Sequence, residues 1–204
     1  MEDRLPPALA EALGCLPDGL RAHLLRTQAL ARDLAGAWGL DTHKAALAAL
    51  THDLCRADPP ALLLEEARRL GLPIHPVEEA VPLLLHGPVA AARLRALGIT
   101  DPEVLDAVRW HSTAHPSLSP VGKVVFLADK VDEGKGVDTD PTLQEVRRLL
   151  YRDLDGALLL YLGRQMARLL EATGLLHPAT VETWNALLLR RRGGQRTLSG
   201  GPTG

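Results

Sequence analysis

The chain contains 204 residues with a formal net charge of −2; 46% of its residues are hydrophobic but only 3% are aromatic. This length fits one large domain, and the near-neutral charge excludes a bulk electrostatic attraction to nucleic acid or to an anionic membrane. Two cysteines are too few for a disulfide framework, and no apolar stretch is long enough to span a bilayer. Because leucine and alanine, both strong helix formers, supply most of the hydrophobic residues, we expect an all-α protein. From the near-neutral charge and the lack of a long apolar stretch, we expect a cytoplasmic protein without nucleic-acid or membrane partners.

Helix start and stop signals divide the sequence into segments in chain order. Pro17-Asp18 and Asp41 begin two early segments, and Pro102 occupies the first position of a later one. We expect loops over residues 72–82 and 133–140. The predicted helices span residues 6–15, 20–38, 41–53, 61–70, 81–97, 102–111, 121–131, 141–173 and 178–190.

Composition also suggests how these helices are organised. We expect an N-terminal helix (1–17), a core (18–135), C-terminal helices that pack on the core (136–190) and a tail (191–204). The tail has few apolar residues, so we expect it to be disordered. The long C-terminal helical segment is expected to break near Gly156.

An adjacent histidine and aspartate, His52 and Asp53, follow the apolar run of residues 45–50. Neighbouring positions of a helix point about 100° apart, so these two side chains meet at one point only around a shared partner. A divalent metal ion is the usual partner of such a pair. The alternative is purely structural: His52 is a core histidine with satisfied hydrogen bonds, and Asp53 caps the next turn.

Further ligand-type residues lie on other predicted helices. His23 is early in the second helix, His86 lies at a helix boundary, and His111 ends a helix. Asp129 falls in an apolar stretch, where an unpaired charge is very costly, so it needs a metal ion, an arginine or a lysine. Four imidazoles and two carboxylates can hold two metal ions if Asp53 bridges them. Nitrogen and oxygen ligands without a thiolate favour iron, manganese, cobalt or zinc over magnesium.

The order His…His-Asp…Asp resembles the signature of the HD-domain phosphohydrolase superfamily. The surrounding motifs are similar to those of its symmetrical bis(5′-nucleosyl)-tetraphosphatases, and the resemblance covers residues 18–170. It implies an HD-domain helical bundle with a C-terminal helical extension. The matching stretches are Arg21-Ala22-His23, His52-Asp53-Leu54-Cys55-Arg56, Leu85-His86-Gly87-Pro88-Val89-Ala90, Ala107-Val108-Arg109-Trp110-His111-Ser112-Thr113 and Lys123-Val124-Val125-Phe126-Leu127-Ala128-Asp129-Lys130.

The resemblance also implies roles for the candidate residues. It implies hydrolysis of diadenosine tetraphosphate to two ADP, with a metal-bound hydroxide attacking an inner phosphorus and His52 and Asp53 as the catalytic pair. Two divalent ions are implied, with iron expected first. The ligands of the first site would be His23, His52, Asp53 and Asp129, and those of the second His86, His111 and the shared Asp53. The candidates for binding the nucleotide are Arg21, Arg56, Ser112, Thr113, Lys123 and Lys130.

The sequence departs from this family in two places. Where the family tends to have Gly-Arg-Pro, this chain has Ala114-His115-Pro116, and where it tends to have Glu-Pro-Asn-Arg, this chain has residues 132–135, Asp-Glu-Gly-Lys. Losing arginine weakens bidentate recognition of phosphate. His115 is then either a general acid or phosphate donor, or a solvent-exposed loop histidine.

The departures leave alternative functions open. One is an HD phosphohydrolase that acts on another nucleotide, such as a nucleoside monophosphate or an alarmone. Another is a nucleotide-binding module without catalysis, although none of the six ligand-type residues is missing. We expect a nucleotide as substrate and leave a homodimer open. His43, His75 and His177 lie in loops or next to helix starts, and we assign them no role.

Overall fold

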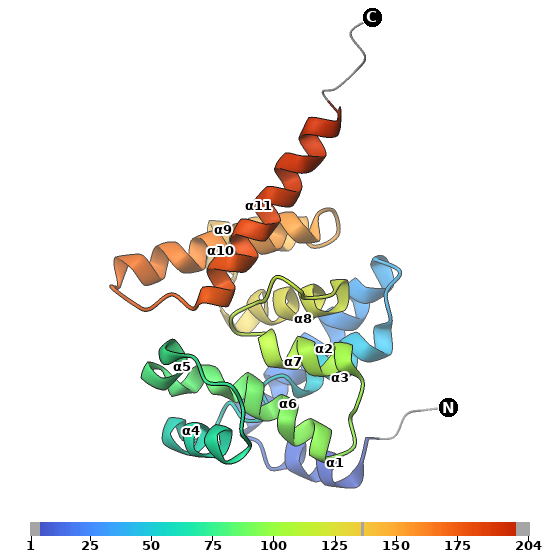
Figure 1. The fold of residues 1–204 in the computed structure, drawn as a ribbon. Coiled ribbons are helices and arrows are strands. Elements are labelled where there is room, and N and C mark those ends of the chain that lie inside the picture. The colour runs from blue at the N-terminus through green and yellow to red at the C-terminus, as the bar shows by residue number, and fades with distance from the viewer. Residues whose placement is uncertain (1–4, 136, 199–204) are drawn as a thin grey trace, which may run out of the picture.

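The computed structural model describes residues 5–135 and 137–198, and all regular structure within these residues is helical (Figure 1). The all-α prediction is therefore confirmed. The α-helices are α1 (Pro7–Gly14), α2 (Asp18–Ala37), α3 (Thr42–Thr51), α4 (Pro60–Arg69), α5 (Pro76–Ala80), α6 (His86–Ala96), α7 (Pro102–Trp110), α8 (Pro120–Lys130), α9 (Pro141–Leu149), α10 (Leu154–Glu171) and α11 (Pro178–Leu198). Three short 3-10 turns are η1 (Pro82–Leu85), η2 (Glu133–Lys135) and η3 (Val137–Thr139).

Short polar side chains and prolines set most helix starts. Asp41 accepts hydrogen bonds from two backbone N–H groups at the start of α3, and Asp101 and Asp140 do the same for α7 and α9. Ser119 caps α8 through the backbone N–H of Gly122. Each of these residues satisfies amide groups that have no partner within the helix. In α7, α8 and α9 the next residue is a proline, which has no N–H and therefore needs no acceptor.

The core is built from aliphatic side chains. Helix α2 packs along α3, and α8 contacts α2, α3 and α7. Phe126 of α8 is fully buried and meets the Tyr161 ring edge-on, with 5.6 Å between ring centroids. The rest of the core consists mainly of leucine, valine and alanine side chains, as the low aromatic content requires.

The last three helices form a second layer. Helix α10 contacts α8, α9 and α11, and Figure 1 shows α9–α11 together above α8, with the last turns of α11 extending away from the body. At the junction with α2, the Trp38 indole donates a hydrogen bond to the carbonyl of Leu150 (2.7 Å), and the Tyr151 hydroxyl donates to Asp33.

Several boundaries differ from the predicted ones, each for a local reason. The predicted loop over residues 72–82 contains α5, which His75 and Glu78 cap reciprocally. The predicted helix over 141–173 does break near Gly156, between Leu149 and Leu154, where the Asp153 side chain accepts from the Gly156 N–H (2.8 Å) and caps the next helix. The segment 133–140 holds η2 and η3.

The tail expected to be disordered from residue 191 is helical as far as Leu198. Arginine is a good helix former, and α11 therefore continues through its arginines at positions 190–192. Arg191 also forms an ion pair with Asp153 at the start of α10. The rest of the predicted tail, residues 199–204, lies outside the described residues. Within the described part of the chain, no helix combines the length and the apolar character needed to cross a bilayer.

Candidate metal centre

The six ligand-type side chains come from separate elements of the bundle and lie together. His52 and His111 directly follow α3 and α7, His86 is the first residue of α6, directly after η1, and Asp129 is on α8. His23 is on the neighbouring α2. All six, including Asp53, are buried. Side chains from positions 23 to 129 therefore meet in one place, as the sequence motifs require.

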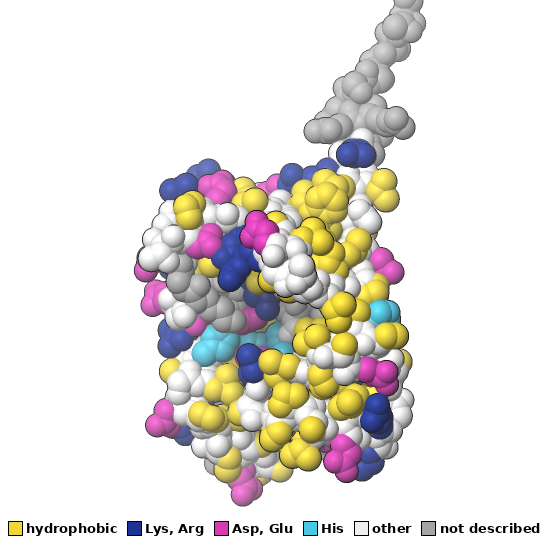
Figure 2. All heavy atoms as spheres, turned by 90° about the vertical axis from the view of Figure 1, so that its left-hand side faces the viewer, with side chains coloured by type: hydrophobic (Ala, Val, Ile, Leu, Met, Phe, Trp, Pro, Cys, Tyr) yellow, Lys and Arg dark blue, Asp and Glu magenta, His cyan; other side chains and the backbone are white. Residues whose placement is uncertain are grey.

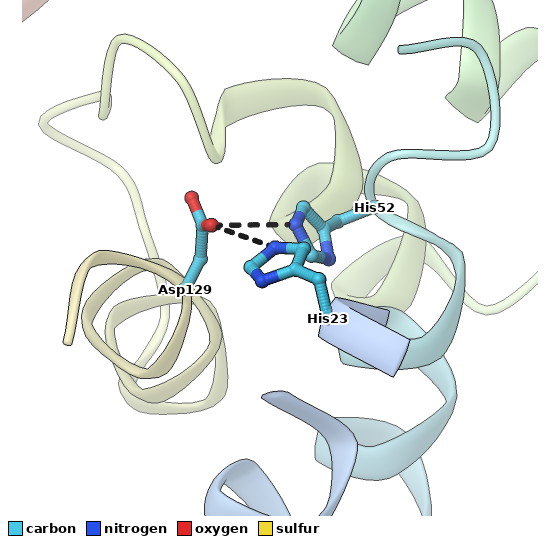
Figure 3. A group of neighbouring side chains, drawn as sticks. All are labelled: His23, His52 and Asp129. Carbon is cyan, nitrogen blue, oxygen red and sulfur yellow. Dashed lines mark ion pairs between the residues drawn. The ribbon is translucent and has the colours of Figure 1, made fainter. Parts of the chain in front are cut away.

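One group is formed by His23, His52 and Asp129 (Figure 3). Oδ1 of Asp129 lies 3.2 Å from Nε2 of His23 and 3.5 Å from Nε2 of His52. Nε2 of His52 is buried and makes no hydrogen bond. These three atoms converge from α2, α3 and α8 on a common point.

A second group surrounds the other side of Asp53. Its Oδ1 lies 3.0 Å from Nε2 of His86 and 3.1 Å from Nε2 of His111, and these two nitrogens are 2.9 Å apart. The Oδ2 atom faces the first group, 3.6 Å from Nε2 of His52 and 4.0 Å from Nε2 of His23. The Asp53 carboxylate thus lies between the two groups, with one oxygen toward each.

Three of the imidazoles share one arrangement with the backbone. Each follows the end of a helix or turn, and its Nδ1 lies close to the carbonyl oxygen three residues earlier. The pairs are His52 with Ala49 (2.7 Å), His86 with Leu83 (2.5 Å) and His111 with Val108 (2.7 Å). Carbonyl groups in a last turn keep acceptor capacity that the helix does not use, so they accept the proton of Nδ1. A neutral imidazole protonated at Nδ1 carries a lone pair on Nε2.

These lone pairs make the second group a set of acceptors without a donor between them. Asp53, His86 and His111 bring three electron-rich atoms within 3.1 Å of one another. Such an arrangement is repulsive unless a cation lies among the atoms. An ion such as zinc, bound at about 2.0–2.2 Å from nitrogen and oxygen, reaches all three atoms of so small a triangle. The residues therefore fit a divalent metal ion.

A glycine permits the close approach of His86 and His111. A Cβ atom on Gly87 would lie 2.7 Å from the carbonyl oxygen of Arg109 and 3.0 Å from that of Val108. Only a residue without a side chain lets the start of α6 touch the end of α7 at this distance. Gly87 is therefore part of the geometry of the site, although it carries no ligand atom.

The charges in the centre suit metal binding. Burial opposes the charge of Asp129, but Lys130 outweighs it, and the pKa of Asp129 is well below its ordinary value. Burial lowers the pKa of His111 to about 4, against the opposing effect of Asp53. Asp129 is thus ionised and His111 is neutral at pH 7.

Lys130 supplies the protein's own cation for Asp129. Its ammonium group is 2.6 Å from Oδ2 of Asp129, and its side chain is only 11% exposed. Burial lowers the pKa of Lys130, but the charge of Asp129 outweighs it and raises the pKa to about 12. Lys130 therefore remains charged beside the centre, on the oxygen of Asp129 that faces away from His23 and His52.

Three other residues predicted to bind the nucleotide lie in three different environments. The Ser112 hydroxyl lies 3.1 Å from Nε2 of His111 and 3.3 Å from Nε2 of His86, at the edge of the centre. Lys123 forms an ion pair with Asp155 of α10 (2.5 Å). Arg56 is exposed in the turn that follows the His-Asp pair.

Two further residues predicted to bind the nucleotide, Arg21 and Thr113, make hydrogen bonds to other groups. Arg21 donates to Asp18 and to the carbonyl of Gly14, because positions 21 and 23 lie about 200° apart around α2. Thr113 is buried, and its hydroxyl donates to a backbone carbonyl of the same turn (3.1 Å). These contacts do not join either side chain to the centre, and their role in nucleotide binding stays a prediction.

The remaining histidines act at backbone turns. His75 accepts from the Val77 N–H and caps α5, and His177 accepts from the Ala179 N–H. His115 stacks on the Trp110 ring, with 4.4 Å between ring centroids, and accepts from the Ser117 N–H. His43 is exposed at the start of α3.

Sequence reasoning missed Asp132 and Arg26. Oδ2 of Asp132 lies 3.0 Å from Nδ1 of His23, and both oxygens accept from the Arg26 guanidinium, at 2.7 and 2.8 Å. Burial raises the pKa of Asp132, but its hydrogen bonds to Arg26 and His23 outweigh this and lower it to about 2. The sequence places Asp132 three residues after Asp129, roughly one helical turn, which is the signal that could have identified it.

The centre keeps a small exposed surface, since His23 is 8% exposed, Asp53 7% and His86 5%. Figure 2 shows histidine side chains at the bottom of a hollow, with basic and acidic side chains beside it.

Comparison with known proteins agrees with this geometry. The sequence profile of the family described as "HD domain" matches residues 20–134. The chain belongs to the HD-domain family. A relative from Bacillus subtilis, named "Bis(5'-nucleosyl)-tetraphosphatase, symmetrical", is 31% identical over 183 residues, covering 87% of this chain and 96% of its own. A protein of the same name from Halalkalibacterium halodurans is 32% identical over 175 residues, covering 83% and 89% of the two chains.

A solved structure shows the same fold. It is a protein from Clostridium acetobutylicum, named a "predicted HD superfamily hydrolase involved in NAD metabolism". It superimposes with a TM-score of 0.84 at 28% identity, covering 90% of this chain and 96% of the other. The predicted family and the enzyme class, an HD-type metal-dependent phosphohydrolase, are confirmed by these matches.

Proposed function

We propose that this HD-domain protein hydrolyses diadenosine tetraphosphate to two ADP. The name shared by the two bacterial relatives supports the substrate, and their matches cover more than four fifths of this chain. The observation that carries the chemistry is the position of Asp53, whose two oxygens face two separate groups of imidazoles. A carboxylate in that position can bridge two ions.

We infer that two divalent ions bind there. His23, His52 and Asp129 would hold the first, with Oδ2 of Asp53, and His86 and His111 would hold the second, with Oδ1 of Asp53. Nitrogen and oxygen donors without a thiolate suit iron, and equally manganese, cobalt or zinc. Elemental analysis of protein purified without chelators would identify the native ion.

The reaction divides the tetraphosphate between its two inner phosphorus atoms. Water adds to one of them, and the bond from that phosphorus to the central bridging oxygen breaks, so that each product keeps two phosphates. When bound, a pair of divalent ions supplies an activated water and neutralises charge on the phosphoryl oxygens. In this proposal His52 and Asp53 contribute to catalysis by holding those ions.

The chain's own groups would position the nucleotide. The Ser112 hydroxyl at the edge of the centre can donate to a phosphoryl oxygen. Lys123 and Lys130 place two ammonium groups along α8, and Arg56 adds an exposed guanidinium after the His-Asp pair. Positive charge fixed in the site before the substrate arrives stabilises a transition state that accumulates negative charge.

The test is a product analysis of purified protein. Chelator-treated protein is reloaded with ferrous iron, manganese, cobalt or zinc and given diadenosine tetraphosphate, AMP or an alarmone, and the products are separated by anion exchange. Two ADP and no ATP are expected from the tetraphosphate, with no turnover by Asp53→Ala. Formation of ATP and AMP would contradict symmetrical cleavage, and turnover of AMP or the alarmone alone would assign the site to another nucleotide. Binding without any turnover would indicate a module without catalysis.

A further inference from the structure

His23 differs from the other three histidines of the centre in its backbone environment. His52, His86 and His111 each donate from Nδ1 to a carbonyl of their own last turn. His23 lies well inside α2, where the carbonyls accept the hydrogen bonds of the helix itself. Nδ1 of His23 accordingly faces a side chain and not a carbonyl of its own last turn.

The carboxylate of Asp132 takes the place of that carbonyl. Its Oδ2 atom lies 3.0 Å from Nδ1 of His23. On the opposite side of the ring, Nε2 of His23 lies 3.2 Å from Oδ1 of Asp129 (Figure 3). His23 thus stands between two carboxylates. It can bind a metal ion through Nε2 only while its proton resides on Nδ1, and Asp132 is the group that accepts that proton.

Arg26 holds Asp132 in place. Its guanidinium donates to both oxygens of the carboxylate, from Nε at 2.7 Å and from the terminal nitrogen at 2.8 Å. The Asp132 side chain is 3% exposed, so water does not compete for these oxygens. Gly134 closes over the pair: a Cβ atom there would lie 3.1 Å from Oδ2 of Asp132. The carboxylate has one orientation available to it.

We propose that Asp132 is a positioning residue for His23, holding its proton on Nδ1 and its Nε2 toward Asp129, and that Arg26 fixes Asp132. This inference rests on the proposed metal centre. Its consequence is selective: Asp132 strengthens the binding of the ion held by His23, His52 and Asp129 and has no effect on the ion held by His86 and His111. Loss of such an outer partner typically weakens metal binding about 10–100-fold.

The experiment measures the affinities of both zinc ions by competition with a chromophoric chelator. In Asp132→Asn, the amide can turn its NH₂ group to Nδ1 of His23 and favour the wrong tautomer. We expect one of the two zinc ions to bind about 10–100-fold more weakly, and the other to bind as in the wild type. Asp132→Glu, which keeps the charge, should lose less than Asp132→Asn. Arg26→Gln, which keeps the carboxylate but removes its support, should give an intermediate loss.

A double-mutant cycle separates positioning from general damage. His23→Ala removes the ligand itself, so adding Asp132→Asn to that variant should cause no further loss of zinc affinity. Adding it to His86→Ala should cause the full loss. The matched control is Asp140→Asn, which breaks a similar aspartate–arginine pair with Arg164 on α9 and α10 and should leave both affinities unchanged.

The possible failures are distinguishable. If the wild type binds fewer than two zinc ions per chain, the proposed metal centre is wrong. If the wild type binds two and Asp132→Asn binds both as tightly, or loses both equally, the role of Asp132 is wrong. Thermal unfolding of each variant identifies any that is simply misfolded, and in that case the comparison of Asp132→Glu with Arg26→Gln decides.

Discussion

Two groups of histidines in this protein differ in the direction of one hydrogen bond. In the metal centre, Nδ1 of His52, His86 and His111 faces a carbonyl oxygen at the end of a helix or turn. In the second group, at the junction of α5 and α11, Nδ1 of His75 and His177 faces a backbone N–H at the start of a helix. The same side chain is a donor in one region and an acceptor in the other.

The difference decides which histidines can bind a metal ion. A histidine that donates from Nδ1 has a lone pair on Nε2, whereas one that accepts at Nδ1 carries its proton on Nε2. Consistent with this, Nε2 of His177 lies 3.7 Å from Oε1 of the buried Glu78. Helix ends expose carbonyls and helix starts expose N–H groups, so the position of a histidine relative to its helix sets its tautomer.

The comparison is tested most directly by removing one histidine from each group. His111→Ala should lose the second ion and reduce hydrolysis by more than the ~10–100-fold that loss of an outer partner costs. His177→Ala should keep both ions and full turnover, and should lose only stability, about 0.5–2 kcal/mol, as for other lost helix caps. Metal content, turnover and urea unfolding of both variants check this. Loss of an ion from His177→Ala would contradict the division of the histidines by the hydrogen bond at Nδ1.

Gly87→Ala should be the next largest effect. The added Cβ would meet the carbonyl oxygen of Arg109 at 2.7 Å, so the start of α6 must move away from the end of α7. We expect an overpacking cost of about 1–3 kcal/mol and weaker binding of the second ion, measured by urea unfolding and chelator competition. Gly36→Ala is the matched control, because its Cβ meets nothing closer than 3.8 Å. Unchanged affinity in Gly87→Ala would show that the helices can separate without moving His86 from His111.

Ala114→Gly should stabilise the protein. Ala114 has φ 59°, a left-handed conformation that disfavours any residue with a Cβ, and the similar family tends to have glycine here. Glycine relieves that strain but has greater conformational freedom in the unfolded chain. We therefore expect the free energy of unfolding to rise by up to about 1 kcal/mol. Both ions should stay bound. The same change at Ala91, within α6, should instead destabilise by roughly 0.5–1 kcal/mol. A loss of stability at Ala114 would mean that packing of its buried methyl group outweighs the strain.

The smallest expected effect is on the acid stability of the region around His75 and His177. Burial raises the pKa of Glu78, but the nearby His177 imidazole and the hydrogen bond from the His75 N–H outweigh it, so the folded pKa is below the ordinary value. The stability that Glu78 contributes is therefore present above its unfolded pKa and lost as the pH falls through the folded pKa. Urea midpoints below pH 5 should fall less steeply for Glu78→Gln than for the wild type. Glu79→Gln, an exposed neighbour paired with Arg68, should follow the wild type.

The sequence by itself determined the helical class, the family and the six side chains that meet. Leucine and alanine content predicted helices, proline and aspartate marked their starts, and the order of His23, His52-Asp53, His86, His111 and Asp129 indicated one shared centre. These features are readable because helix propensity and capping are local, and because a metal centre requires particular side chains. The ligand roles themselves stay predictions until ions are measured.

Only the tertiary structure decided which of the surrounding polar residues belong to the centre. Arg21 and Thr113 are close to ligands in the chain but turn away from them, while Asp132 reaches His23 across 109 positions. A helix turns its side chains about 100° at each step, so proximity along the chain does not give direction. Contacts between helices arise only when the bundle packs, and the packing of α2 against the segment after α8 is what joins Arg26, Asp132 and His23.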